Sequence, residues 1–150
     1  MLSKYYDYMA AIKTYLQSNY NIYLAAIEAE YDAGLRNVEN WINGFKDPYT
    51  INLYPALMIF PENIPFDGFT LSAYNNRTVI DLIIAETIGE RDGLTMLHYA
   101  SAMQNLITND FSLGGNVEDC NIMAIRHFPP ESNGIGVINV QIEISKEIQF

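Results

Sequence analysis

The residues of this sequence that could carry chemistry are two histidines, one cysteine and scattered carboxylates. His98 and His127 lie far apart in the chain, and neither has a second His or Cys at the spacing that holds a zinc ion. Cys120 follows Glu118 and Asp119, and these negative neighbours should raise the pKa of the thiol, which opposes a nucleophilic role. We therefore expect all three residues to be structural.

The carboxylates and glycines give no stronger signal. Asp81 and Glu86 fall five residues apart on one expected strand, so they should point to opposite faces and cannot jointly hold a metal without other ligands. We expect Asp81 to be a solvated strand residue. The Gly114-Gly115 pair lacks the lysine and helix start of a phosphate loop, and predicts a tight turn with positive φ. No Ser-His-Asp signature is readable, so the sequence predicts no enzyme, no cofactor and no metal site.

Composition sets the broad class of the protein. A chain of 150 residues, with 49% apolar and 17% charged residues, fits one globular domain covering residues 1–150. A net charge of −10 disfavours a grip on duplex DNA, which needs Lys and Arg on phosphates. The single cysteine excludes an internal disulfide and fits a reducing cytoplasm. We see no signal peptide, and no apolar run reaches the roughly 20 residues that span a membrane.

Three segments have the periodicity of helices. The first begins after Ser3, a possible cap, and has an apolar stripe of Tyr5, Met9, Ile12 and Leu16. After an expected break at 19–21, a second stripe contains Tyr20, Tyr23, Leu24, Ile27 and Tyr31; one bent helix across both segments is the alternative. The third helix follows Gly93 and has a broad face of Met96, Tyr99, Ala100, Met103, Leu106 and Ile107. Leu94 and Leu97 widen this face, so we expect the third helix to be well buried.

The strand signals lie in the remaining segments. The apolar run 53–60 predicts a strand covered on both faces, with Pro55 near its start and a loop at 61–68. Residues 69–88 read as one bent strand or two, and 121–128 as another, whereas 36–50 has no clear period. The alternation in 137–148 is the cleanest, and predicts that Ile138, Val140, Ile142 and Ile144 face a core. The element order predicts an α+β fold, with a mixed or antiparallel sheet packed on one face by helices.

Three stretches carry a resemblance to a known family. They are 53–62, an early strand that starts with Tyr-Pro and ends with Pro-Glu; 105–117, a long helix that runs into Phe-Ser-Leu-Gly-Gly-Asn-Val; and Phe128-Pro129-Pro130 before the final alternating strand. In these stretches and in element order, the chain resembles the bacteriophage tail-terminator and tail-completion proteins, which join the tail to the head.

The resemblance implies a structural virion protein that is assembled in the bacterial cytoplasm and located in the tail or neck. Such proteins form homo-oligomeric rings, typically hexamers, which cap the tail tube and dock the head–tail connector protein. DNA would pass through the lumen without specific binding, which an acidic surface would favour.

The eleven tyrosines suggest where subunits could meet, because tyrosine is common at interfaces. Adjacent residues on a helix diverge by about 100°, so Tyr5 and Tyr6 cannot both face one core. We therefore expect a possible oligomer interface among the tyrosines of the first two helical segments: Tyr5, Tyr6, Tyr8, Tyr15, Tyr20 and Tyr23.

Two other functions remain open from the sequence. Within the same class, the chain could be a neck adaptor or another minor virion protein. From a different class, it could be a small cytoplasmic α+β module that holds a ligand against the third helix.

Overall fold

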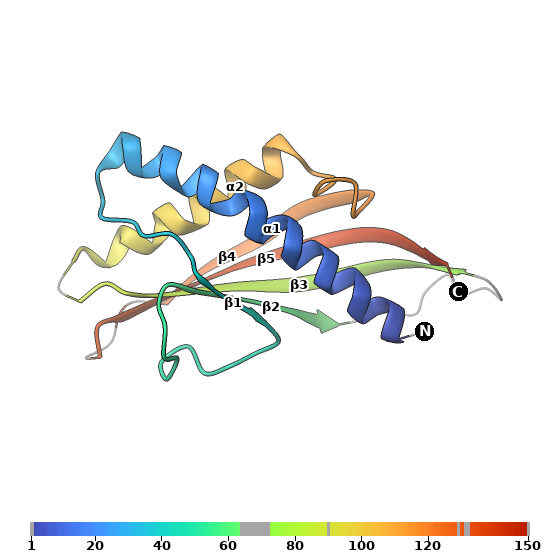
Figure 1. Cartoon of the computed structure of the whole chain (residues 1–150), viewed down its shortest axis with the longest axis horizontal. Coiled ribbons are helices and arrows are strands. Elements are labelled where there is room, and N and C mark those ends of the chain that lie inside the picture. The colour runs from blue at the N-terminus through green and yellow to red at the C-terminus, as the bar shows by residue number, and fades with distance from the viewer. Residues whose placement is uncertain (1, 64–72, 90, 129, 131–132, 150) are drawn as a thin grey trace.

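Helices cover one face of a curved sheet (Figure 1). The computed structural model describes residues 2–63, 73–89, 91–128, 130 and 133–149. The elements are α1 (Leu2–Tyr31), β1 (Asn40–Asn43), β2 (Ala56–Asn63), β3 (Ala73–Thr87), the 3-10 turn η1 (Gly93–Thr95), α2 (Met96–Asn109), β4 (Asp119–Phe128) and β5 (Ile135–Gln149). The expected α+β class is confirmed.

Among the described residues, the sheet has five strands in the order β1-β2-β3-β5-β4. The β1–β2 pair is parallel and the other described pairs are antiparallel, so the sheet is mixed. β5 lies between β3 and β4 and pairs with both along most of its length, so the final strand is central in the sheet. β1 and β4 are the two edges of the sheet.

α1 is one continuous helix, so the expected break at 19–21 is wrong and the single-helix alternative is right. The two asparagines in this segment are compatible with a helix because their side-chain amides donate hydrogen bonds to backbone carbonyls. Asn19 Nδ2 donates to the carbonyl of Tyr15 one turn back, and Asn21 Nδ2 donates to the carbonyl of Val38. Ser3 lies inside α1 and not before it.

The strands differ from expectation at two places. β1 lies in the segment 36–50, where no period was readable, and it exists because Trp41 and Ile42 pair in register with Leu57 and Met58. β2 runs through Pro61 to Asn63, with a register shift between these two residues, so the expected loop starts later than 61. Residues 64–72, which include the rest of that loop and the start of the expected 69–88 strand, lie outside the described residues.

The face of the sheet under α1 and α2, called the helix face here, carries the main core. Ile80, Leu82, Ile84, Ile138, Val140, Ile142 and Ile144 all point to it and are fully buried. The helices contribute Ile12, Leu16, Tyr20, Tyr99, Met103 and Leu106 to the same cluster. This confirms the expected facing of the final strand. β2 is also covered on both faces, as expected, since Leu57 packs against the helices and Met58 against the other side.

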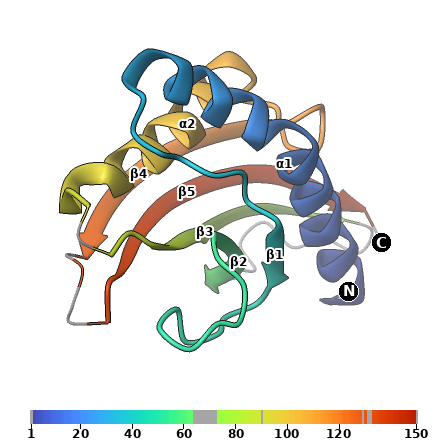
Figure 2. The ribbon, with the colours of Figure 1, turned by 60° about the vertical axis from the view of Figure 1, so that its left-hand side comes forward.

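The other face, called the opposite face here, is covered in part by the segment 44–55, which folds away from the helices (Figure 2). Tyr49 and Tyr54 pack there against Ala85 and Val137. This segment also makes the crossover that a parallel β1–β2 pair requires.

α2 buries its predicted face, but Leu94 and Leu97 are 58% and 41% exposed. The expectation that these two leucines extend the buried stripe is therefore wrong. Leu94 lies in η1 and Leu97 in the first turn of α2, beyond the part of the helix surface that α1 and the sheet cover.

Candidate functional site

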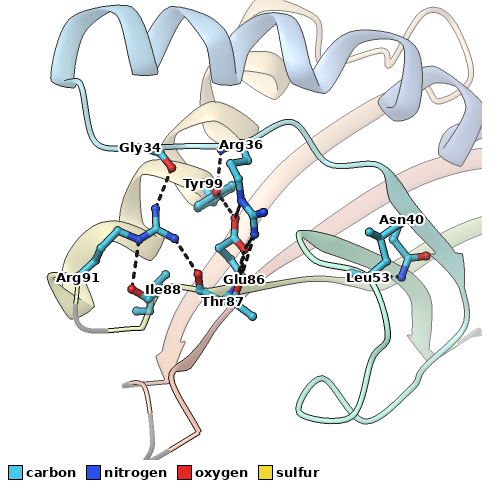
Figure 3. Close-up of polar contacts among 9 residues, drawn as sticks. All are labelled: Gly34, Arg36, Asn40, Leu53, Glu86, Thr87, Ile88, Arg91 and Tyr99. Carbon is cyan, nitrogen blue, oxygen red and sulfur yellow. Dashed lines mark hydrogen bonds and ion pairs between the residues drawn. The ribbon is translucent and has the colours of Figure 1, made fainter.

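Glu86 is fully buried at the end of β3, on the helix face, and both of its carboxylate oxygens accept hydrogen bonds (Figure 3). Arg36 donates from Nε over 3.1 Å and also from Nη2. Tyr99 Oη donates over 3.0 Å, and the backbone N of Thr87 donates over 2.7 Å. A buried carboxylate is stable only with such partners, because desolvation of an unpaired charge is costly.

The residues around Glu86 come from four separate parts of the chain. Arg36 belongs to the linker between α1 and β1, and its backbone N donates to Tyr99 Oη over 3.1 Å (Figure 3). Tyr20 of α1 donates from its hydroxyl to the Tyr99 carbonyl over 2.7 Å. Burial raises the pKa of Tyr99 and also that of Tyr20, so both hydroxyls remain protonated donors. The cluster therefore joins both helices to the sheet.

Arg91 forms a second bridge nearby (Figure 3). Its Nη1 donates to the Gly34 carbonyl over 2.8 Å, Nη2 to the Thr87 carbonyl over 2.8 Å and Nε to the Ile88 carbonyl over 3.1 Å. Backbone carbonyls thus hold the guanidinium against the end of β3, a structural use of this cation.

The sequence suggested that Asp81 is solvated, and this expectation is wrong. Asp81 lies on the opposite face and is only 7% exposed. Its Oδ1 accepts from Asn139 Nδ2 over 3.0 Å and from Gln141 Nε2 over 3.2 Å. Gln141 Nε2 also donates to Glu62. Asp81 and Glu86 do point to opposite faces of the sheet, as expected, and each is held by its own set of donors.

The histidines and the cysteine have structural surroundings. The His98 ring packs on Tyr31 with centroids 4.7 Å apart, and His127 Nε2 lies 3.0 Å from the Gly93 carbonyl oxygen. Cys120 is buried, and burial first, then the charge of Asp119, raises its pKa to about 12. Within the described ranges, no three His, Cys, Asp or Glu side chains are placed to hold a metal ion.

The turn at Gly114-Gly115 has the positive φ values that the sequence suggested, +70° and +84°. Asp110 organises this turn by accepting from Gly114 N over 2.9 Å and from Tyr15 Oη over 2.8 Å. The hydrogen bond from the Ser112 hydroxyl, followed by those from Tyr15 and Gly114, lowers the pKa of Asp110.

Two cavities lie at opposite ends of the helical layer. One of about 310 Å³ beside the start of α2 is lined by Ala33, Arg91, Asp92, Leu94, Thr95 and His98. The other, of about 370 Å³, is apolar and lies between the start of α1 and the β1–β2 edge. It is lined by Tyr5, Tyr6, Met9, Asn43, Gly44, Ile59 and Pro61. Phe45, which is 60% exposed, lies just beyond Gly44 after the end of β1 and packs edge-on against Phe60.

The six tyrosines named as possible interface residues separate into distinct environments. Tyr5, Tyr8 and Tyr20 are buried within the monomer, so their rings already have partners inside the fold. Tyr15 and Tyr23 are partly buried, and their hydroxyls bond Asp110 and Asn109. Tyr6 alone of the six is largely exposed, at 66%. The oligomer interface stays a prediction, and Tyr6 is the member available for it.

An exposed apolar surface that the sequence did not predict lies along edge strand β4. Met123 is 53%, Ile125 41% and Phe128 44% exposed. The contact of His127 with Gly93 brings the start of α2, with exposed Leu94 and Leu97, next to the end of this strand. Phe128 pairs with Val137 and so lies on the opposite face of the sheet, away from Ile125. We call Met123, Ile125, Leu94 and Leu97 the β4 patch. A long edge strand with apolar side chains offers a template for pairing with another chain.

In the part of the chain that the structure describes, no helix is long and apolar enough to cross a membrane. No protein-family model matches the sequence, and no curated protein matches it.

Proposed function

We propose that this chain is a structural phage protein, a tail-terminator or tail-completion subunit whose ring caps the tail tube and joins it to the head connector. The proposal rests on the resemblance in residues 53–62, 105–117 and 128–130 and on the α+β architecture that the resemblance implies.

The observation that carries the proposal furthest is that both edges of the sheet have an apolar surface. The β4 patch lies at one edge, and the cavity beside Tyr6, with exposed Phe45, lies at the β1–β2 edge. A ring is built from one heterologous interface, in which one surface of each subunit contacts a different surface of the next. Apolar surfaces on opposite edges supply such a pair. The net charge of −10 would let DNA pass without sticking.

Native mass spectrometry tests the proposal, with the protein alone and mixed with the tail tube protein of the same phage. We expect a closed ring, of six subunits by the resemblance, in at least one of the two samples. A protein that stays monomeric or dimeric in both samples contradicts the terminator function.

Two single variants test which surfaces close the ring. Met123→Glu damages the β4 patch, and Tyr6→Glu damages the surface at the other edge. Each should abolish the ring alone. When the two variants are mixed, the intact β4 patch of Tyr6→Glu can still bind the intact β1–β2 edge of Met123→Glu. Each pair then has no further intact surface to offer, so we expect heterodimers and no ring. Ile22→Glu is the matched control, since Ile22 is equally exposed, at 66%, on α1 and lies outside both surfaces.

A further inference from the structure

We propose that β4 of this chain pairs antiparallel with β4 of a second copy, which gives a two-fold dimer with a continuous sheet. The dimer is inferred from the residues of β4 alone. Its role, which rests on the proposed function, is to occupy the β4 edge until the subunit meets the tail tip, so that rings do not close in solution.

The charges of β4 are complementary to themselves. Asp119 begins the strand and Arg126 lies near its end, and both side chains are exposed. Among the described residues, no ion pair engages the Arg126 guanidinium. In an antiparallel pair centred between Ile122 and Met123, Asp119 of each copy lies opposite Arg126 of the other. Opposite charges in directly facing positions stabilise a strand pair, and by symmetry the contact occurs twice.

The register also matches the faces of the sheet. Asp119 pairs with Ser145 and Arg126 with Asn139, so both belong to the opposite face. Cys120 pairs with Ile144, which places it on the helix face. Ile125, the residue that would lie opposite Cys120 in the second copy, is on the helix face as well, since it pairs with Val140.

Met123 makes this match possible. The pairing of β4 with β5 shifts by one between Ile122 and Ala124, and leaves Met123 as an extra residue. Strand residues alternate between faces, so a strand without this extra residue would set Asp119 and Arg126 on different faces. In the dimer, the exposed Met123 and Ile125 side chains would be covered near the two-fold axis.

Charge reversal tests the pairing. In the Asp119→Arg variant, an arginine at position 119 lies opposite Arg126 of the other copy. In the Arg126→Asp variant, an aspartate at position 126 lies opposite Asp119. Each variant alone should dimerise about tenfold more weakly than the wild type, because two attractive cross-strand pairs become repulsive. The double variant D119R/R126D should regain the wild-type affinity. An equimolar mixture of the two single variants should form a heterodimer, because every facing pair is then opposite in charge.

Sedimentation equilibrium at low and high salt is the measurement, with circular dichroism to confirm that each variant is folded. Glu30→Arg and Lys13→Asp on α1 make the same changes in net charge away from β4 and should leave dimerisation unchanged. A wild-type protein that is monomeric at its highest soluble concentration overturns the proposal. A dimer that the single reversals do not weaken, or that the double reversal does not restore, also overturns it.

Failure of the dimer is distinguishable from failure of the terminator function. A ring on the tail tube with no charge-sensitive dimer in solution removes this inference and leaves the proposed function standing. A charge-sensitive dimer that never gives rings with tube protein does the reverse.

Discussion

Replacing Glu86 with alanine tests whether the buried carboxylate holds the helical layer to the sheet. The substitution leaves the buried Tyr99 hydroxyl without its acceptor at 3.0 Å and Arg36 without its partner. A hydrogen bond to a charged group contributes about 1.5–3 kcal/mol, and the Tyr99 bond, being buried, should count in full. The Arg36 side chain is 53% exposed, so its pair is discounted to about 1 kcal/mol. With the small cavity added, the expected loss is about 3–5 kcal/mol, which is also typical of breaking a buried pair.

Urea unfolding followed by circular dichroism measures this loss as a lower midpoint at unchanged slope. The matched control is Glu30→Ala, an exposed carboxylate on α1, which should change stability by less than about 0.5 kcal/mol. Arg36→Ala should cost less than Glu86→Ala. The double variant should cost less than the sum of both, because the two residues share one interaction. A loss below about 1 kcal/mol for Glu86→Ala, or strict additivity with Arg36→Ala, would refute the reasoning.

Three further outcomes are expected. Ile142→Asp should unfold the protein, since it places an unpaired charge on a fully buried position, and a wild-type melting temperature would show that the assigned facing is wrong. Gly114→Ala should cost clearly more than Gly115→Ala: both have positive φ, but a Cβ at Gly114 would lie 2.7 Å from the Tyr15 ring, whereas Gly115 has open space. Equal losses in urea midpoint would contradict this. The fold lowers the pKa of Asp110, so the ionised carboxylate stabilises the folded state. This stabilisation is fully present above the ordinary pKa of an aspartate and is lost as the pH falls through the lower pKa of the folded state. The stability difference between wild type and Asp110→Asn should therefore shrink below about pH 4, and a constant difference would count against it.

The parts of the fold that the sequence predicted are those with a strong local period. The alternation at Ile138, Val140 and Ile142 identifies β5 and its buried face, because one face of that strand is covered along its length. β1 has no such signal: its four residues become a strand only through pairing with β2, which is distant in sequence. A period also gives no information on which end of a helix extends past its neighbours, so Leu94 and Leu97 were wrongly expected to be buried.

The polar clusters could not have been predicted for a related reason. The sequence around Asp81 shows only a charged residue within a strand, and such a residue is normally expected to be solvated. The donors that allow its burial, Asn139 and Gln141, come from β5, which is distant in sequence. The burial of Glu86 depends on its partner Arg36, which lies in a segment without periodicity. Likewise, Met123 and Ile125 are ordinary strand residues that become exposed only because β4 is an edge of the sheet.

The central position of β5 has a consequence for folding during translation. β5 is the last of the strands to be synthesised, although it separates β3 from β4 in the sheet. Until β5 has emerged from the ribosome, β3 lacks its longest ladder and β4 lacks the β5 partner, so both would present unpaired backbone and apolar side chains. A nascent chain of this topology therefore depends on late, long-range strand insertion, which is slow and prone to aggregation. Chaperone binding during synthesis would accordingly be expected on β3 and β4.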